Sequence, residues 1–233
     1  MDDAVYQYQH ARSPKELLFQ FTRCMVHFAV DDAQVKFCTR LQGKESWFLP
    51  FNKGYKDGAG NPPNPDGLMT DYLWKQVLTK DMLSRIIENY ATLVEEKDEE
   101  TGKTRYKQIF PRYHQLTAVE SLLADVKKNG VGNRYLIQHS AGSGKSNSIA
   151  WLAHQLTGLE DAQGNLLVDS VIVVTDRVVL DKQIRDTIRQ FAQTRNIIAW
   201  AEHSGDLRKA IEDGRRIIIT TIGKFPYVLP EIG

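Results

Sequence analysis

The sequence predicts an α/β protein in which a parallel sheet with helices on both faces follows a smaller α+β segment. Two runs in the C-terminal half, 171–174 and 216–221, contain three or more consecutive β-branched apolar residues, and segments with helical apolar spacing lie between them. Strands buried on both faces of a parallel sheet have this composition. With 42% hydrophobic residues among 233, the chain can bury a substantial core.

Composition limits the partners and the location of the protein. The 30 basic and 29 acidic side chains give a formal net charge of +1, so any nucleic-acid site must be a local feature of the surface. The acidic start lacks the pattern of a signal peptide, and no apolar run reaches the length of a membrane span. We therefore expect a cytoplasmic protein without a membrane partner. Cys24 and Cys38 have neither paired spacing nor a histidine cluster, so they indicate no disulfide framework and no zinc site.

The α+β segment is expected to span residues 1–94 and to include a helix near its start. Ser13 can cap this helix, with Pro14 at the first helical position and Glu16 three residues after the cap. The side chains expected on its buried side are Leu17, Leu18 and Phe21.

Short strands and two further helices are expected in the same segment. Runs rich in β-branched and aromatic residues predict strands that are separated by turns at 31–32 and 43–44. The expected strands are 25–30, 35–41 and 47–51. The stretch 52–67 holds four glycines and three prolines and predicts a long loop. Thr70 and Thr79 are expected to cap the two helices, the second with Leu83, Ile86, Ile87 and Tyr90 on its apolar face.

A charged stretch, 95–109, predicts a linker or a solvated hairpin and marks a domain boundary. The pattern changes in the following domain, 110–233, where a first helix should end at 129–130. Four strands that alternate with helices are expected at 135–137, 171–174, 197–200 and 216–221. This arrangement predicts a parallel sheet with right-handed crossovers.

The stretch from Arg134 to Ser146 has the organisation of a phosphate-binding loop. An apolar run leads into Gly142, Gly144 and Lys145, and a helical pattern follows. Glycines let backbone N–H groups surround a phosphate, and a helix that begins there adds the positive end of its dipole. The residues expected to bind a nucleotide are Ala141, Gly142, Ser143, Gly144, Lys145 and Ser146.

Two side chains of this loop have predicted chemical roles. Lys145 is the expected catalytic residue because its ammonium would reach the β- and γ-phosphates of ATP, and Ser146 would hold Mg²⁺. The pattern is incomplete, because its first glycine falls on His139. A glycine-rich turn between buried elements remains the alternative, and His139 is expected to pack at the strand end.

Residues from Phe110 onward resemble the first RecA-like domain of superfamily-two helicases and translocases. Gln115 lies ahead of the loop where that superfamily keeps a glutamine that reads adenine, and an amide can donate to and accept from an adenine edge together. The resemblance implies an ATP site in which Gln115, helped by Arg112, positions the base.

Two further motifs of this superfamily lie at the carboxyl ends of predicted strands, where open α/β sheets place their ligand contacts. The resemblance implies that they contact the DNA backbone, and hydroxyls and cations can hold phosphates without reading sequence. The implied DNA contacts are Thr175, Arg177, Thr220, Thr221 and Lys224.

A narrower resemblance, to the R subunits of type I restriction enzymes, covers essentially the whole chain. The stretches 171–177 and 220–225 are similar to the motor of those subunits, and 48–54 and 58–62 resemble the segment that joins nuclease to motor. The resemblance implies an ATP-dependent DNA translocase and endonuclease subunit that uses ATP and Mg²⁺. Its implied partners are double-stranded DNA and the methylation and specificity subunits of the restriction complex.

Such R subunits are far longer, so the chain is expected to be an internal fragment. The resemblance implies that the nuclease residues precede Met1. It also implies that the acidic metal motif and the second RecA-like domain follow Gly233. On this interpretation the isolated chain binds nucleotide weakly and hydrolyses almost no ATP.

Two other functions remain open at this point. A self-contained P-loop kinase or NTPase would bind Mg²⁺ through Asp176, which follows an apolar strand. A non-catalytic module would dock a partner through its front half and keep the loop only as a vestige.

Overall fold

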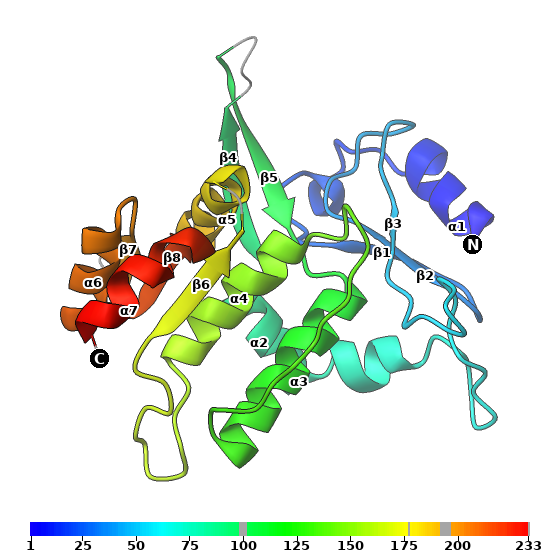
Figure 1. The fold of residues 1–233 in the computed structure, drawn as a ribbon. Helices are drawn as coiled ribbons and strands as arrows, with labels where there is room; N and C mark the ends of the chain where they lie inside the picture. Colours follow the sequence, from blue (N-terminus) through cyan, green and yellow to red (C-terminus); the bar gives the residue numbers. More distant parts are fainter. Residues whose placement is uncertain (98–101, 177, 192–196, 233) are drawn as a thin grey trace. The chain divides into compact units, whose positions relative to one another are not determined.

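The structure, a computed structural model, describes residues 1–97, 102–176, 178–191 and 197–232. The chain folds as two compact units, Met1–His114 and Gln115–Gly233. Figure 1 shows their helices and strands.

The first unit contains an antiparallel sheet with the strand order β1-β2-β3. Its strands are β1 (His27–Val30), β2 (Val35–Cys38) and β3 (Leu49–Pro50), and they follow α1 (Asp2–Tyr6) and the π-helix η1 (Gln7–Ala11). Each strand lies within a range that the sequence predicts. An aromatic cluster covers this sheet, with Phe51 fully buried and 5.7 Å from Phe37 between ring centroids. Because its strands are short, this sheet is stabilised mainly by edge-to-face packing of aromatic rings and less by its backbone hydrogen bonds.

The helix predicted from Ser13 does not form, and this expectation is wrong. The capping contacts exist, since the backbone N–H of Ser13 donates to Glu16 Oε1 at 3.1 Å. The chain then makes only the 3₁₀ helix η2 (Leu17–Phe19) and reaches Thr22 with a φ of 75°. A cap satisfies N–H groups but a helix also needs a buried face, and Leu17 and Leu18 are 63% and 75% exposed.

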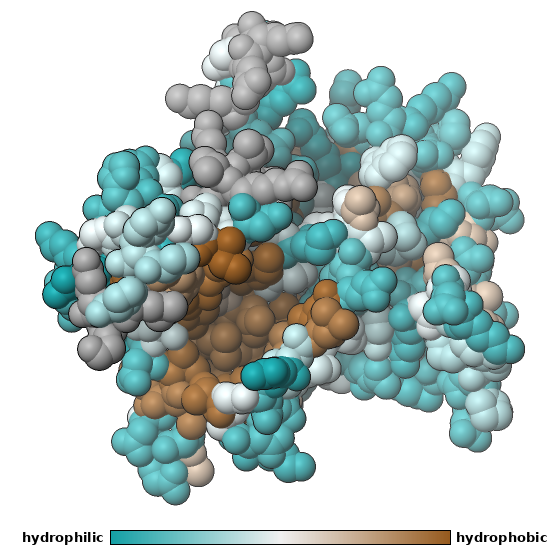
Figure 2. All heavy atoms as spheres, viewed as in Figure 1, coloured by the Kyte–Doolittle hydropathy of each residue, from teal (hydrophilic) through white to brown (hydrophobic). Residues whose placement is uncertain are grey.

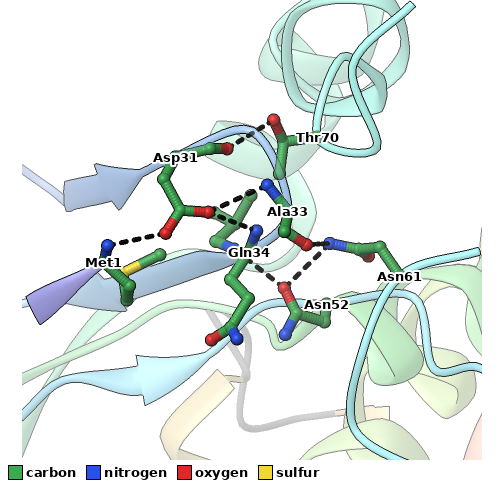
Figure 3. A network of polar contacts seen from close by, with 8 residues as sticks. Met1, Asp31, Ala33, Gln34, Asn52, Asn61 and Thr70 are labelled. Carbon is green, nitrogen blue, oxygen red and sulfur yellow. Dashed lines mark hydrogen bonds and ion pairs between the residues drawn. The ribbon is translucent and has the colours of Figure 1, made fainter. Parts of the chain in front are cut away.

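A buried polar network ties the long loop to the turn between β1 and β2 (Figure 3). The Asn61 side chain, 2% exposed, donates to Ala33 O at 2.9 Å and to Asn52 Oδ1 at 3.0 Å. The Asp31 carboxylate accepts from two backbone N–H groups of the same turn. The Thr70 hydroxyl donates to Asp31 O at 2.8 Å, so Thr70 holds the loop and does not cap the helix predicted there.

Two helices and a hairpin complete the first unit. The π-helix η3 (Leu73–Val77) precedes α2 (Lys80–Asn89), which Thr79 caps as predicted by accepting from the Met82 N–H at 3.4 Å. The α2 face that contains Ile86 is buried, whereas Ile87 is 51% exposed, which contradicts its predicted place on the apolar face. The strands β4 (Thr92–Lys97) and β5 (Thr104–Ile109) pair antiparallel from Thr92↔Ile109 to Lys97↔Thr104.

The second unit contains a parallel sheet with the order β6-β8-β7. Its strands are β6 (Val171–Thr175), β7 (Ile198–Trp200) and β8 (Ile217–Thr221). Its helices are α3 (from Tyr113 at the end of the first unit to Asn129), α4 (Lys145–Thr157), α5 (Val178–Phe191), α6 (Ser204–Glu212), η5 (Ile222–Lys224) and α7 (Phe225–Ile232). Parallel strands with helical crossovers are what the alternating sequence pattern predicts.

Helices cover both faces of this sheet, because successive side chains of the central strand β8 point to opposite sides. Ile217 and Ile219 pack with side chains of α4 and α5, and Ile218 packs with side chains of α6 and α7. All three isoleucines are fully buried. The predicted parallel sheet is thus confirmed for three strands.

The fourth predicted strand, 135–137, is not formed. These residues form no regular element, and Tyr135, Leu136 and Ile137 are 47%, 92% and 44% exposed. A strand needs a neighbour for its backbone groups, and none of the described residues pairs with this segment. The apolar composition of 135–137 is typical of a strand. Composition alone does not say whether a neighbouring strand is present to pair with it. Figure 2 shows apolar side chains gathered over β6, where Ile172 and Val174 are exposed.

Candidate nucleotide site

The glycine-rich loop has the backbone that its sequence requires. Gly142 and Gly144 adopt φ values of 71° and 81°, in the left-handed region that favours glycine, and α4 begins at Lys145 directly afterwards. The first turn of a helix leaves N–H groups without helical partners, so this end of α4 presents donors toward a bound anion. The loop can therefore cradle a phosphate.

The Lys145 side chain closes the loop on itself. Its ammonium donates to His139 O at 3.2 Å and to Ser140 O at 2.8 Å. The sequence did not predict these two acceptors. Every residue has a backbone carbonyl, so residue type does not show which carbonyl will accept a hydrogen bond. In this conformation the cation is held where it can move to a phosphate by exchanging one set of oxygens for another.

His139 is half-buried beside this cation. Burial lowers the pKa of its imidazole, and the positive charge of Lys145 lowers the pKa further. Both effects disfavour the protonated ring, so His139 adds no second positive charge to the loop near neutral pH.

Gln115 anchors the loop from α3. Its side chain is 2% exposed, and Nε2 donates to Gly144 O at 2.8 Å. The same carbonyl accepts from the backbone N–H groups of Asn147 at 3.0 Å and Ser148 at 3.4 Å. The adenine contact of Gln115 therefore stays a prediction, and in this conformation its amide positions the turn. Arg112 belongs to the other unit, and its predicted role is likewise untested.

The hydroxyls around α4 differ in their exposure. Ser146 is half-buried in the first turn, where the predicted Mg²⁺ contact requires it, whereas Ser143 is 5% exposed. The Ser148 hydroxyl is buried and has no hydrogen-bond partner among the described residues. In the part of the chain that the structure describes, no three His, Cys, Asp or Glu side chains converge on a metal position. The role of Ser146 in holding Mg²⁺ stays a prediction.

The predicted DNA contacts lie at the carboxyl ends of β6 and β8. Thr175 pairs with Thr221 across the ladder, and the Thr175 hydroxyl donates to Thr220 O at 3.5 Å. Thr220 is fully buried and its hydroxyl has no partner within the described residues. Lys224 lies in η5, directly after β8, and its ammonium donates to the backbone oxygen of Ala201, which follows β7. The fifth predicted contact, Arg177, falls outside the described residues.

The exposed fraction of each side chain shows which of the predicted DNA contacts reach the surface in this conformation. Thr221 and Lys224 are partly exposed, whereas Thr175 and Thr220 lie in the interior of the sheet. Asp176, which follows β6, is exposed. The sheet therefore brings the two strand ends together but offers solvent only part of the predicted contact set.

Comparison with known proteins gives a match to a protein family. Residues 114–231 match the SWI2/SNF2 ATPase family. The matched range contains the glycine-rich loop, Gln115 and both strand ends. No curated protein matches the chain. Within the described residues, no helix is both long enough and apolar enough to cross a membrane.

Proposed function

The chain belongs to the SWI2/SNF2 ATPase family and is a helicase-like, nucleotide-binding ATPase, and we propose that it is the nucleotide-binding part of the motor in a type I restriction R subunit. The main support for an ATP site is the geometry of the loop, which has two glycines at positive φ and Lys145 at the start of α4. The restriction system is supported by the resemblance of 48–54 and 58–62 to the segment that joins nuclease and motor in R subunits.

In the proposed mechanism the chain's own groups do the binding work. Lys145 leaves the carbonyls of His139 and Ser140 and contacts the β- and γ-phosphates, while backbone N–H groups from Gly142 to Ser146 surround the β-phosphate. Bound Mg²⁺ supplies positive charge against the developing charge on the phosphates, and Ser146 holds it. Gln115, helped by Arg112, positions the adenine ring and keeps the turn at Gly144 in place.

We also propose that the sheet is part of a larger, RecA-like one. β6 is an edge strand in the described sheet, and its exposed side chains Ile172 and Val174 are apolar. The segment 135–137 is apolar, and it pairs with no strand within the described part of the chain. A further strand that ends in carboxylates would pair with an edge of this sheet and supply the water-orienting group that an ATPase needs.

The proposed partner of the motor is double-stranded DNA, together with the methylation and specificity subunits of a restriction complex. Thr221 and Lys224 are its first DNA contacts because they are partly exposed at the strand ends. Thr175 and Thr220 shape these ends from inside the sheet, and Arg177 completes the set. Contacts through hydroxyls and a cation hold phosphates without reading sequence, which suits a motor that moves over any DNA.

A self-contained kinase or NTPase is the second candidate function, because Asp176 is exposed at the end of β6. Calorimetric titration with ATP in the presence and absence of Mg²⁺ separates the two. In the proposed motor Ser146→Ala should lower the Mg²⁺-dependent part of the affinity about tenfold, whereas Asp176→Asn should leave it unchanged. If Asp176→Asn removes that part and Ser146→Ala does not, the kinase assignment replaces the motor assignment.

A further inference from the structure

The first turns of α4 contain a buried hydroxyl that lacks a hydrogen-bond partner. Ser148 is 9% exposed, and within the part of the chain that the structure describes its Oγ atom makes no hydrogen bond. A buried hydroxyl in this condition costs free energy, because it has lost its hydrogen bonds to water. Its burial is explained by a second state of the site in which the hydroxyl is bonded.

The backbone oxygen of Gly144 is the acceptor that the Ser148 hydroxyl is placed to use. In a helix, a serine hydroxyl can donate to the carbonyl four residues earlier in the chain. Gly144 holds that position, and its carbonyl already accepts from the Ser148 backbone N–H at 3.4 Å. The hydroxyl therefore needs a change in the χ1 angle of Ser148 to reach this oxygen, and no movement of the helix.

Gln115 occupies this acceptor in the structure. The donors to the Gly144 oxygen among the described residues are Gln115 Nε2 at 2.8 Å, the Asn147 N–H at 3.0 Å and the Ser148 N–H at 3.4 Å. A carbonyl oxygen has two lone pairs, so these three donors already exceed its capacity for well-aligned hydrogen bonds. The Ser148 hydroxyl therefore stays unbonded as long as the Gln115 amide holds Gly144.

We propose that Ser148 is a positioning residue for adenine recognition, because its hydroxyl replaces Gln115 on the Gly144 oxygen when the Gln115 amide turns to the base. The predicted adenine contact uses both ends of the amide, since it donates to N7 of the ring and accepts from the 6-amino group. Gln115 is 2% exposed and must leave its buried position to make this contact. The inference rests on the proposed function, since a bound adenine nucleotide is what draws Gln115 away.

The exchange lowers the cost of moving Gln115. The Gly144 oxygen keeps a side-chain donor, and the Ser148 hydroxyl gains the acceptor that it lacks in the structure. The turn at the start of α4 therefore keeps its shape while the amide contacts the base. The part of the ATP affinity that depends on adenine should depend on Ser148, whereas the contacts of the loop with phosphates should not.

Calorimetric titrations of the full chain with ATP, ITP or inorganic tripolyphosphate, each with Mg²⁺, test this exchange. ITP has an oxygen in place of the 6-amino group, so it offers no donor to the Gln115 amide. The unaltered chain should bind ATP more tightly than ITP, and Ser148→Ala should lower the ratio of the two affinities about fivefold without changing the affinity for tripolyphosphate. Ser121→Ala, which removes an exposed hydroxyl from α3, should leave the ratio unchanged.

Thermal unfolding without nucleotide tests the exchange independently of ATP. On its own, Ser148→Ala removes an unbonded buried hydroxyl and should leave the melting temperature unchanged or raise it. In a Gln115→Ala chain the hydroxyl is expected to bond to the Gly144 oxygen, so adding Ser148→Ala should lower the melting temperature by about 2–6 °C. A hydroxyl that only fills space would give the same change in both backgrounds.

The outcomes separate a failure of the exchange from a failure of the proposed function. The inference is overturned if Ser148→Ala and Ser121→Ala show the same ratio of ATP to ITP affinity, or if Ser148→Ala changes the melting temperature equally in both backgrounds. It is also overturned if the unaltered chain binds ATP and ITP equally, a result that leaves the phosphate loop in place. If the unaltered chain binds neither ATP nor tripolyphosphate, the proposed function fails and the inference fails with it.

Discussion

The contact between Gly144 and Gln115 controls the shape of the nucleotide loop at the level of single residues. A Cβ atom built on Gly144 would lie 2.5 Å from Gln115 Nε2, and the φ of Gly144 is 81°. Two independent requirements, backbone conformation and space, therefore select glycine here. Gln115 accordingly supports the turn that aims the N–H groups of the loop.

Gly144→Ala should destabilise the second unit by about 1–3 kcal/mol, because an L side chain is strained at positive φ and displaces Gln115. Gly142→Ala has the same kind of φ, 71°, but nothing within 4 Å of its added Cβ. It isolates the backbone strain, and Gly158→Ala, which lies at a negative φ in open space, serves as the neutral control. Urea unfolding measures all three. Equal costs for Gly144→Ala and Gly142→Ala would show that the Gln115 contact contributes nothing.

The helices and strands show which sequence features were sufficient to predict an element and which were not. The cap at Thr79 and the buried strand β8 were predictable, because a capping hydroxyl and three consecutive isoleucines need no distant partner to be recognised. The stretch 135–137 has the composition of a strand, yet a strand exists only beside another. The helix expected from Ser13 failed for the same kind of reason, since its cap was correct but Leu17 and Leu18 found no surface to cover.

Some features of the candidate site could likewise be predicted from the sequence, and others could not. The positive φ values of Gly142 and Gly144 and the start of α4 at Lys145 were predictable, because they depend on local backbone chemistry. The burial of Thr220 was not predicted, although a central strand that helices cover on both faces buries side chains on both of its sides. The acceptors of Lys145 could not be predicted, since they are carbonyl groups of a loop whose path depends on Gln115.

The strand β1 makes the first unit sensitive to pH. His27 at its start is 5% exposed, and burial lowers the pKa of its imidazole. The unfolded chain has a histidine pKa of about 6.5 and therefore binds more protons than the folded chain. Stability from the neutral ring is present above that value and is lost as pH falls below it.

Urea unfolding at pH 7.5 and pH 5.5 tests this expectation. The unaltered chain should lose stability at the lower pH, and His27→Gln should lose less, because a neutral amide has no proton to gain. A smaller loss remains in that variant, since the pKa of His139 is also lowered. His10→Gln, at an exposed position, is the control. If His27→Gln and His10→Gln show the same pH dependence, the assignment to His27 is wrong.

The molecule consists of an α+β unit with a buried network of polar contacts and a second unit with a parallel sheet. The second unit contains the nucleotide loop. The chain's net charge of +1 gives no global attraction to DNA, so the proposed DNA binding must come from local groups such as the strand ends.

Lys145→Ala tests the central claim, that this loop binds the phosphates of ATP, most directly. A fluorescent ATP analogue with Mg²⁺ is titrated into the unaltered chain, into Lys145→Ala, and into Lys128→Ala, whose exposed lysine lies near the end of α3. Loss of a charged contact of about 1.5–3 kcal/mol predicts at least a tenfold weaker affinity for Lys145→Ala, with thermal unfolding unchanged and Lys128→Ala unaffected. Equal affinity in all three proteins would contradict the account.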